Sequence, residues 1–106
     1  MAIKMYVDPG ACRFQTMITA HMDGDTVRLD IESECPMVRA LGKEVRELEP
    51  LECLRTPLAK NPVIRAAGDC IKHASCPVPL AIIKSVEACS GMAVKKDVRL
   101  SFSPDV

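Results

Sequence analysis

The chain contains no tryptophan, one tyrosine and two phenylalanines among its 106 residues. A hydrophobic core must therefore be built from aliphatic side chains, which suits a layer of helices packed on a sheet. The 14 basic residues balance the 14 acidic ones, so the summed charge offers no attraction for nucleic acid or for an anionic membrane. We therefore expect no nucleic-acid partner, while a protein partner remains open.

Long hydrophobic runs are also missing. The N-terminal residues hold too short an apolar run for a signal peptide, and no stretch approaches the roughly 20 apolar residues of a membrane span. These absences predict a cytoplasmic protein with no membrane partner. The length fits one domain, residues 1–106, that is large enough to fold without disulfides.

No Cys-x-x-Cys pair occurs, although the chain holds six cysteines. Disulfides are rarely structural in the cytosol, so these residues predict thiols, metal thiolates or sulfur chemistry rather than a disulfide framework. Because the usual paired spacing is absent, a metal site would need cysteines that are distant in the sequence to meet in the fold.

Alternating apolar residues predict a β-hairpin over residues 14–33. Every second position is mostly apolar up to Met22 and again from Val27, and Asp23-Gly24 between them is a strong signal for a hairpin turn. Two further stretches alternate in the same way, residues 3–7 and 98–102. They predict a first strand and a C-terminal strand that share the core.

The hairpin register brings two cysteines together. A two-residue turn at Asp23-Gly24 pairs Ala20 with Val27, and the same pairing continued outward sets Cys12 opposite Cys35 on the core face. A four-residue turn shifts the pairing by two positions and leaves the two cysteines as diagonal neighbours at about 7–8 Å. Both registers predict that the two thiols lie close together.

Proline at the first helical position marks three helix starts. The helices begin at Pro36, Pro62 and Pro77, and we expect them to end near Pro50, His73 and Gly91. The poorly patterned residues 51–60 predict a short helical turn and a loop. The fold class that follows is α+β: a two-layer sandwich of an antiparallel sheet, built around the central hairpin, with helices packed on one face.

Cys76 and Cys35 each precede a proline at a predicted helix start. Unpaired N–H groups and the positive end of the helix dipole favour a thiolate there, which makes Cys76 the candidate nucleophile and both residues candidate metal ligands. Cys12 joins them through the hairpin register, and His73 could supply a fourth ligand. The simpler alternative is that each cysteine is a small buried hydrophobe.

The remaining cysteines give a weaker signal. Cys70 and Cys89 fall on the apolar stripes of predicted helices, which is typical of core packing. Cys53 lies in the unpatterned region and could be exposed or packed.

Two resemblances bear on these residues. Cys76-Pro77-Val78-Pro79, followed by an apolar helix and an extended segment, resembles the Cys-Pro-x-Pro motif of TusA-like sulfur carriers. In that family the motif cysteine carries a persulfide, so the resemblance implies this role for Cys76. The whole chain, with its Asp-Pro-Gly-x-Cys start, Glu-Cys-Pro middle and Cys-Pro-Val-Pro helix, is similar to a small uncharacterised family of anaerobic prokaryotes.

Three functions follow as hypotheses. The first is a site for zinc, another soft metal ion or an iron–sulfur cluster, bound by Cys12, Cys35 and Cys76, with His73, water or an exogenous ligand in fourth place. The second is sulfur transfer or thiol exchange, with Cys76 as the nucleophile and Cys35 or Cys12 as the resolving thiol. The third is a structural or interaction module with packed thiols.

Overall fold

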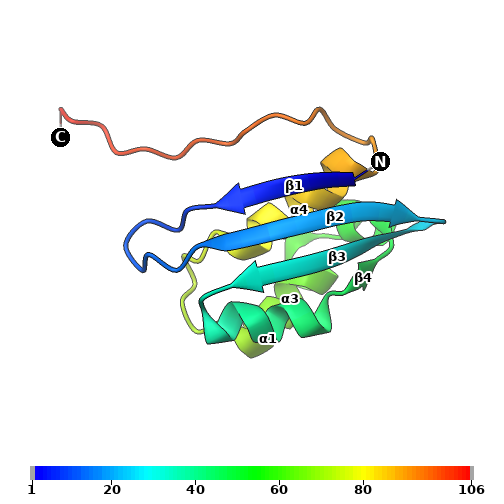
Figure 1. Ribbon diagram of the computed structural model, residues 1–106, viewed down its shortest axis with the longest axis horizontal. Coiled ribbons are helices and arrows are strands. Elements are labelled where there is room, and N and C mark those ends of the chain that lie inside the picture. The colour runs from blue at the N-terminus through cyan, green and yellow to red at the C-terminus, as the bar shows by residue number, and fades with distance from the viewer. Residues whose placement is uncertain (1, 106) are drawn as a thin grey trace.

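A computed structural model describes residues 2–105 as a four-stranded antiparallel sheet with helices on one side (Figure 1). The elements in chain order are β1 (Ala2–Val7), β2 (Thr16–Asp23), β3 (Thr26–Ser33), α1 (Pro36–Glu44), β4 (Glu47–Leu48), α2 (Pro50–Arg55), the 3-10 helix η1 (Leu58–Lys60), α3 (Pro62–Cys70) and α4 (Val78–Cys89). The predicted α+β fold with a central antiparallel hairpin is confirmed.

The sheet has the order β1-β2-β3-β4, and one of its faces forms the floor of the core. Along β2, Thr16, Ile18 and Ala20 are buried while the residues between them are more exposed, as expected for a sheet covered on one side. Helix α4 packs on β1 and β2, and α1 packs on β3. Among residues 2–105, no helix is long and apolar enough to cross a membrane.

The hairpin turn differs from the one predicted. Its two central residues are Gly24 and Asp25, and Asp23 pairs with Thr26. The strands therefore have the register of the four-residue alternative, and the prediction of a two-residue turn at Asp23-Gly24 is wrong. Gly24 supplies the left-handed residue of the turn at φ +64°, and the Asp23 carboxylate is bound by the side chain of Arg28 at 2.6 Å.

Two of the helix starts are confirmed, and the third is shifted by one residue. Cys35 is the N-cap of α1, which begins at Pro36, and Asn61 is the N-cap of α3. The Asn61 side-chain oxygen accepts hydrogen bonds from the first free N–H groups of that helix, so it does the work expected of an N-cap. Helix α4 begins at Val78, after Pro77.

Helices α1 and α3 end earlier than predicted, at Glu44 and Cys70. After α1 the Arg46 carbonyl accepts a hydrogen bond from the Leu29 N–H at 2.8 Å, and Leu48 pairs with Val27 as part of β4. Pairing with the edge of β3 gives the backbone groups of this segment hydrogen-bond partners and buries Leu48. This pairing replaces further helix, although the apolar spacing of the sequence continues.

The predicted C-terminal strand is not formed. Residues 94–105 contain no helix or strand, and Val98, Leu100 and Phe102 are 52%, 83% and 103% exposed instead of joining the core. A strand needs a neighbour to accept its hydrogen bonds, and in this chain no described strand pairs with this segment. The alternation of apolar residues indicates that this segment can form a strand, but it does not show whether a neighbouring strand pairs with it.

Candidate functional site

Three segments carrying cysteines meet at one end of the sheet. They are the loop between β1 and β2, the N-terminal end of α1 and the N-terminal end of α4, which lie together at the left of Figure 1. Cys12 belongs to the loop, Cys35 is the N-cap of α1, and Cys76 lies two residues before α4. We call these residues the thiol end of the molecule.

The loop that carries Cys12 has an unusual backbone. The Gly10 N–H is held by the Asp8 carboxylate at 3.0 Å, and the Arg13 N–H closes a turn onto the Gly10 carbonyl at 3.0 Å. Arg13, next to Cys12, adopts φ +64°, a left-handed conformation that a residue with a long side chain rarely takes. Residues in such conformations cluster at ligand-binding and active sites, which makes this loop a candidate part of a site.

Hydrogen bonds tie this loop to the segment that carries Cys35. The Gln15 N–H donates to the Glu34 carboxylate at 2.9 Å, and the Glu34 N–H donates to the Gln15 carbonyl at 3.3 Å. The Cys35 N–H is bound by the Ser33 hydroxyl at 3.1 Å. The start of α1 is therefore anchored to the end of the Cys12 loop.

The position of Cys12 corrects one prediction. Strand pairing stops at Thr16 and Ser33, so Cys12 does not continue β2 on the core face but lies exposed in a turn. Cys35 is buried, as expected for a residue at the junction of sheet and helix. The loop residues 8–15 leave the sheet because Asp8, Pro9 and Gly10 form turns of their own, which the strand arithmetic ignored.

Cys76 is partly buried against the core and lies in a tight turn. Its N–H donates to the carbonyl of His73 at 3.0 Å, and its thiol accepts a hydrogen bond from the Val78 N–H. Burial raises the pKa of Cys76, the Val78 N–H lowers it, and repulsion from Cys35 and then Cys12 raises it further. Cys76 therefore lies close enough to Cys35 and to Cys12 for their charges to influence its pKa.

The direction of this pKa change corrects the expectation that the helix N-terminus would favour the Cys76 thiolate. Burial outweighs the helix end, because the prolines on either side of Val78 leave few N–H donors in the first turn. The residues that predicted a helix start therefore also weaken its effect on the thiol.

His73 is exposed, and the structure shows its backbone, through the carbonyl, in contact with Cys76. Within residues 2–105, no three histidine, cysteine, aspartate or glutamate side chains stand in an arrangement that could already hold a metal ion. At the thiol end, Cys35 and Cys12 both influence the pKa of Cys76, but the described side chains form no closed ligand set.

The other three cysteines belong to the helix layer. Cys53 and Cys89 are buried and Cys70 is partly buried, each within a helix. Burial is the largest cause that raises the pKa of each thiol, and for Cys53, where nearby carboxylates add to it, the pKa reaches about 11. The core interpretation of Cys70 and Cys89 agrees with this placement, and the open question of Cys53 is answered as packed.

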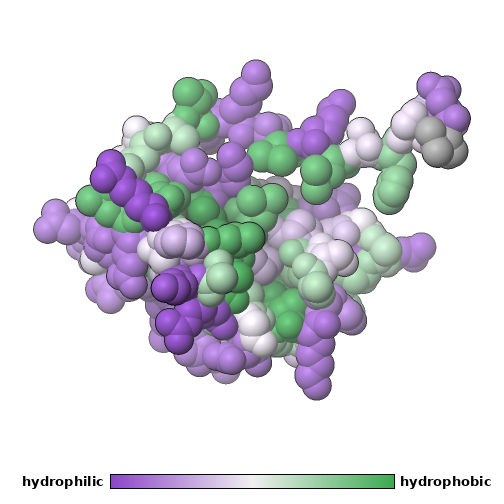
Figure 2. Space-filling model, turned by 180° about the vertical axis from the view of Figure 1, so that it is seen from behind, coloured by the Kyte–Doolittle hydropathy of each residue, from purple (hydrophilic) through white to green (hydrophobic). Residues whose placement is uncertain are grey.

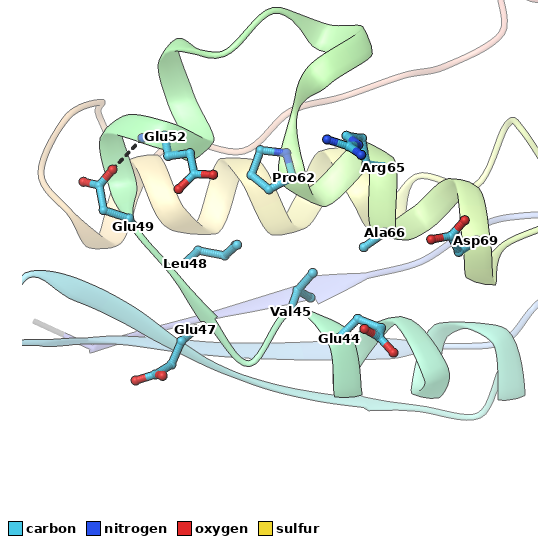
Figure 3. A pocket seen from close by; sticks show the side chains of 10 residues that line it. All are labelled: Glu44, Val45, Glu47, Leu48, Glu49, Glu52, Pro62, Arg65, Ala66 and Asp69. Atoms are coloured by element: carbon cyan, nitrogen blue, oxygen red, sulfur yellow. Dashed lines mark hydrogen bonds between the residues drawn. The ribbon is translucent and has the colours of Figure 1, made fainter.

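A separate pocket of about 440 Å³ lies beside β4, α2 and α3 (Figure 3). Carboxylates surround it, from Glu44, Glu47, Glu49, Glu52 and Asp69, together with the guanidinium of Arg65. Two of these groups have structural partners, since Glu49 caps α2 and Glu47 pairs with Arg28. No cysteine lines the pocket, so it is distinct from the thiol end.

Fold and site together define a small α+β protein with thiols gathered at one end of its sheet. The chain belongs to a family of unknown function (DUF6951), whose model matches residues 3–102. No curated protein and no solved structure matches it. The resemblance to TusA-like sulfur carriers is not among these findings, whereas the resemblance to an uncharacterised family agrees with them.

Proposed function

We propose that Cys12, Cys35 and Cys76 form a thiolate site for a soft metal ion or an iron–sulfur cluster. The observation that carries this proposal is the meeting of three separate segments, each bearing a cysteine, at one end of the sheet. Three sulfur ligands favour zinc, cuprous copper or an iron–sulfur cluster over hard cations.

The electrostatics of the thiols support a cation. Repulsion from Cys35 and Cys12 adds to burial in raising the pKa of Cys76. A cation held between the sulfurs would replace this repulsion with attraction and displace the thiol protons. Binding should therefore strengthen as the pH rises toward the pKa of Cys76.

Closing the site requires a movement, because the described side chains do not yet form a ligand set. Cys12 is the residue best placed to move, since it is exposed in a loop whose turn depends on the left-handed Arg13. Cys35 and Cys76 are held by the starts of α1 and α4 and would form the fixed half of the site. The fourth ligand would be His73, water or an exogenous group.

The test is the metal and acid-labile sulfide content of the protein after anaerobic purification. Wild-type protein should retain zinc, copper or iron, and Cys76→Ser should lose it without unfolding. Cys70→Ser is the matched control, because it also removes a partly buried thiol but lies in the helix layer. Wild-type protein that contains neither metal nor sulfide, and that does not take up zinc, cuprous copper or iron when reduced, contradicts the proposal.

Sulfur transfer is the second candidate, and it is favoured by the fact that the described thiols form no closed ligand set. In this reaction the Cys76 thiolate attacks the outer sulfur of a donor persulfide, takes up the S–H group and releases the donor thiolate. Mass spectrometry of reduced, metal-free protein after treatment with a persulfide donor would detect one added sulfur on Cys76. Addition to Cys70 to the same extent would speak against a dedicated carrier.

A further inference from the structure

The segment after α4 carries apolar side chains that are largely exposed. We call residues 94–105 the tail; its apolar residues Val98, Leu100 and Phe102 alternate with Arg99, Ser101 and Ser103. This is the pattern of a strand with one buried face, yet these apolar side chains are mostly or fully exposed. Figure 2 shows apolar and polar residues mixed along the projecting tail at the upper right.

The sheet has an unpaired edge, at β1, to which such a strand could be added. Among residues 2–105, strand β1 pairs with β2 alone, so every second residue of β1 directs its N–H and C=O groups outward without a partner strand. Edge strands are usually protected by proline, charge or a bulge. Within β1, residues 2–7, there is no proline, the pairing with β2 is continuous, and Lys4 is the single charged residue.

Within its own chain the tail is not paired with this edge, because residues 94–105 form no strand and the sheet does not include them. Gly91 turns the backbone at φ +77°, and the N–H groups of Met92 and Ala93 both donate to the Glu87 carbonyl, at 3.0 and 3.2 Å. From this cap the tail runs along the β1 side of the molecule, and its end projects past the tip of β1 (Figure 1). The molecule is accordingly 46 Å long but only 28 by 25 Å across.

We propose that two copies of this chain exchange their tails, so that residues 98–102 of each copy add a strand to the β1 edge of the other. The occupant is a second copy because the strand-forming segment and the open edge occur in the same chain without pairing there, the end of the tail projects away from the molecule, and a two-fold exchange satisfies both segments at once. The tail is also part of the family's shared length, since the family model extends to residue 102. Val98, Leu100 and Phe102 would then continue the core face of the sheet beside Ile3 and Val7.

Sedimentation velocity of the full chain across the micromolar range tests the exchange. The wild type should dimerise, and the double variant Leu100→Asp/Phe102→Asp should dimerise at least roughly tenfold more weakly, because it places charge on the face to be buried. Ser101→Asp/Ser103→Asp is the matched control, with the same added charge on the polar face, and should dimerise like the wild type. All four residues are exposed in the single chain, so the core should fold in every variant.

Hydrogen exchange on the same samples locates the contact. Dimer formation should protect the amides of residues 98–102 and add protection to residues 2–7, and the apolar double variant should lose both effects. A wild type that stays monomeric overturns the proposal, whether the tail is unprotected or protected by pairing within its own chain. A dimer that forms equally well in the apolar double variant, or that leaves residues 2–7 unchanged, overturns it as well.

Discussion

The six cysteines fall into two regions that differ in what faces the sulfur. At the thiol end, Cys12, Cys35 and Cys76 come from three segments whose ends meet. In the helix layer, Cys53, Cys70 and Cys89 lie within helices, and burial is the largest cause that raises the pKa of each. The difference teaches that the place of a cysteine within its element decides whether other cysteines influence its pKa: cysteines at the ends of segments do so for Cys76, whereas none is a cause for the cysteines within helices.

Alkylation of reduced, metal-free native protein near neutral pH should separate the two regions most widely. Cys12 is exposed, whereas Cys53 is 1% exposed and has a pKa of about 11, so Cys53 should react roughly a thousandfold more slowly. Cys76 should fall between them. It should exceed Cys89, which is buried, and Cys70, whose thiolate is repelled by Glu44 and Asp69, whereas the Val78 N–H favours the thiolate of Cys76. Rates can be measured by mass spectrometry of each cysteine peptide. Cys76 reacting no faster than Cys89 would place it with the packed thiols.

Removing the N-cap of α3 should destabilise the helix layer that contains Cys53. Asn61 caps α3 through its side-chain oxygen and donates from its amide to the Cys53 carbonyl. We expect Asn61→Ala to lower the free energy of unfolding by about 2–4 kcal/mol, since it removes a cap and leaves a buried carbonyl without a donor. Asn61→Asp keeps the capping oxygen and should lose less. Equal losses in urea denaturation would show that the cap contributes nothing.

The pKa of Cys53 predicts a loss of stability in alkaline solution. Its value of about 11 in the folded protein exceeds the ordinary 9.0, so the folded state holds this proton more tightly than the unfolded state. The resulting stabilisation is complete below pH 9 and is lost as the pH rises through 11, by roughly 2–3 kcal/mol. Cys53→Ala should show a correspondingly shallower decline over this range. Denaturant unfolding at each pH measures this decline in the free energy of unfolding. An identical decline in both proteins would refute the prediction.

Serine in place of Cys76 should have the smallest effect on stability. The hydroxyl can accept the Val78 N–H in place of the sulfur, and the site is only partly buried, so we expect less than about 1 kcal/mol of change. Circular dichroism and urea unfolding measure it. If Cys76→Ser unfolds the protein, Cys76 serves the core, and a loss of metal or persulfide in that variant could not be assigned to the site.

Much of the fold could be predicted because it rests on local chemistry. The alternation of residues 14–33, the Asn61-Pro62 pair and the Cys35-Pro36 pair each specify a hairpin or a helix start within a few residues. The turn itself was placed one residue too early, because Asp23-Gly24 and Gly24-Asp25 satisfy the same turn chemistry and only the strand pairing chooses between them.

What escaped prediction depends on contacts between distant segments. Helix α1 ends at Glu44, shortly before Leu48 pairs with Val27, and the apolar spacing of its sequence carries no sign of that pairing. The thiol end was expected for a partly wrong reason, since Cys12 lies in a loop and not on β2. The left-handed Arg13 is a further feature of that loop with no signal in the sequence, because nothing about an arginine predicts φ +64°.

Cadmium titration of the reduced protein tests most directly whether Cys12, Cys35 and Cys76 form one site. Cadmium is a soft ion whose thiolate bonds give a strong ultraviolet charge-transfer absorption, so the signal reports the number of bound sulfurs. We predict that one equivalent saturates the wild type, and that serine at any one of the three positions lowers the absorption by about a third while Cys70→Ser leaves it unchanged. An absorption that survives intact in Cys12→Ser and Cys76→Ser, or that falls equally in Cys70→Ser, would contradict a shared site at the thiol end.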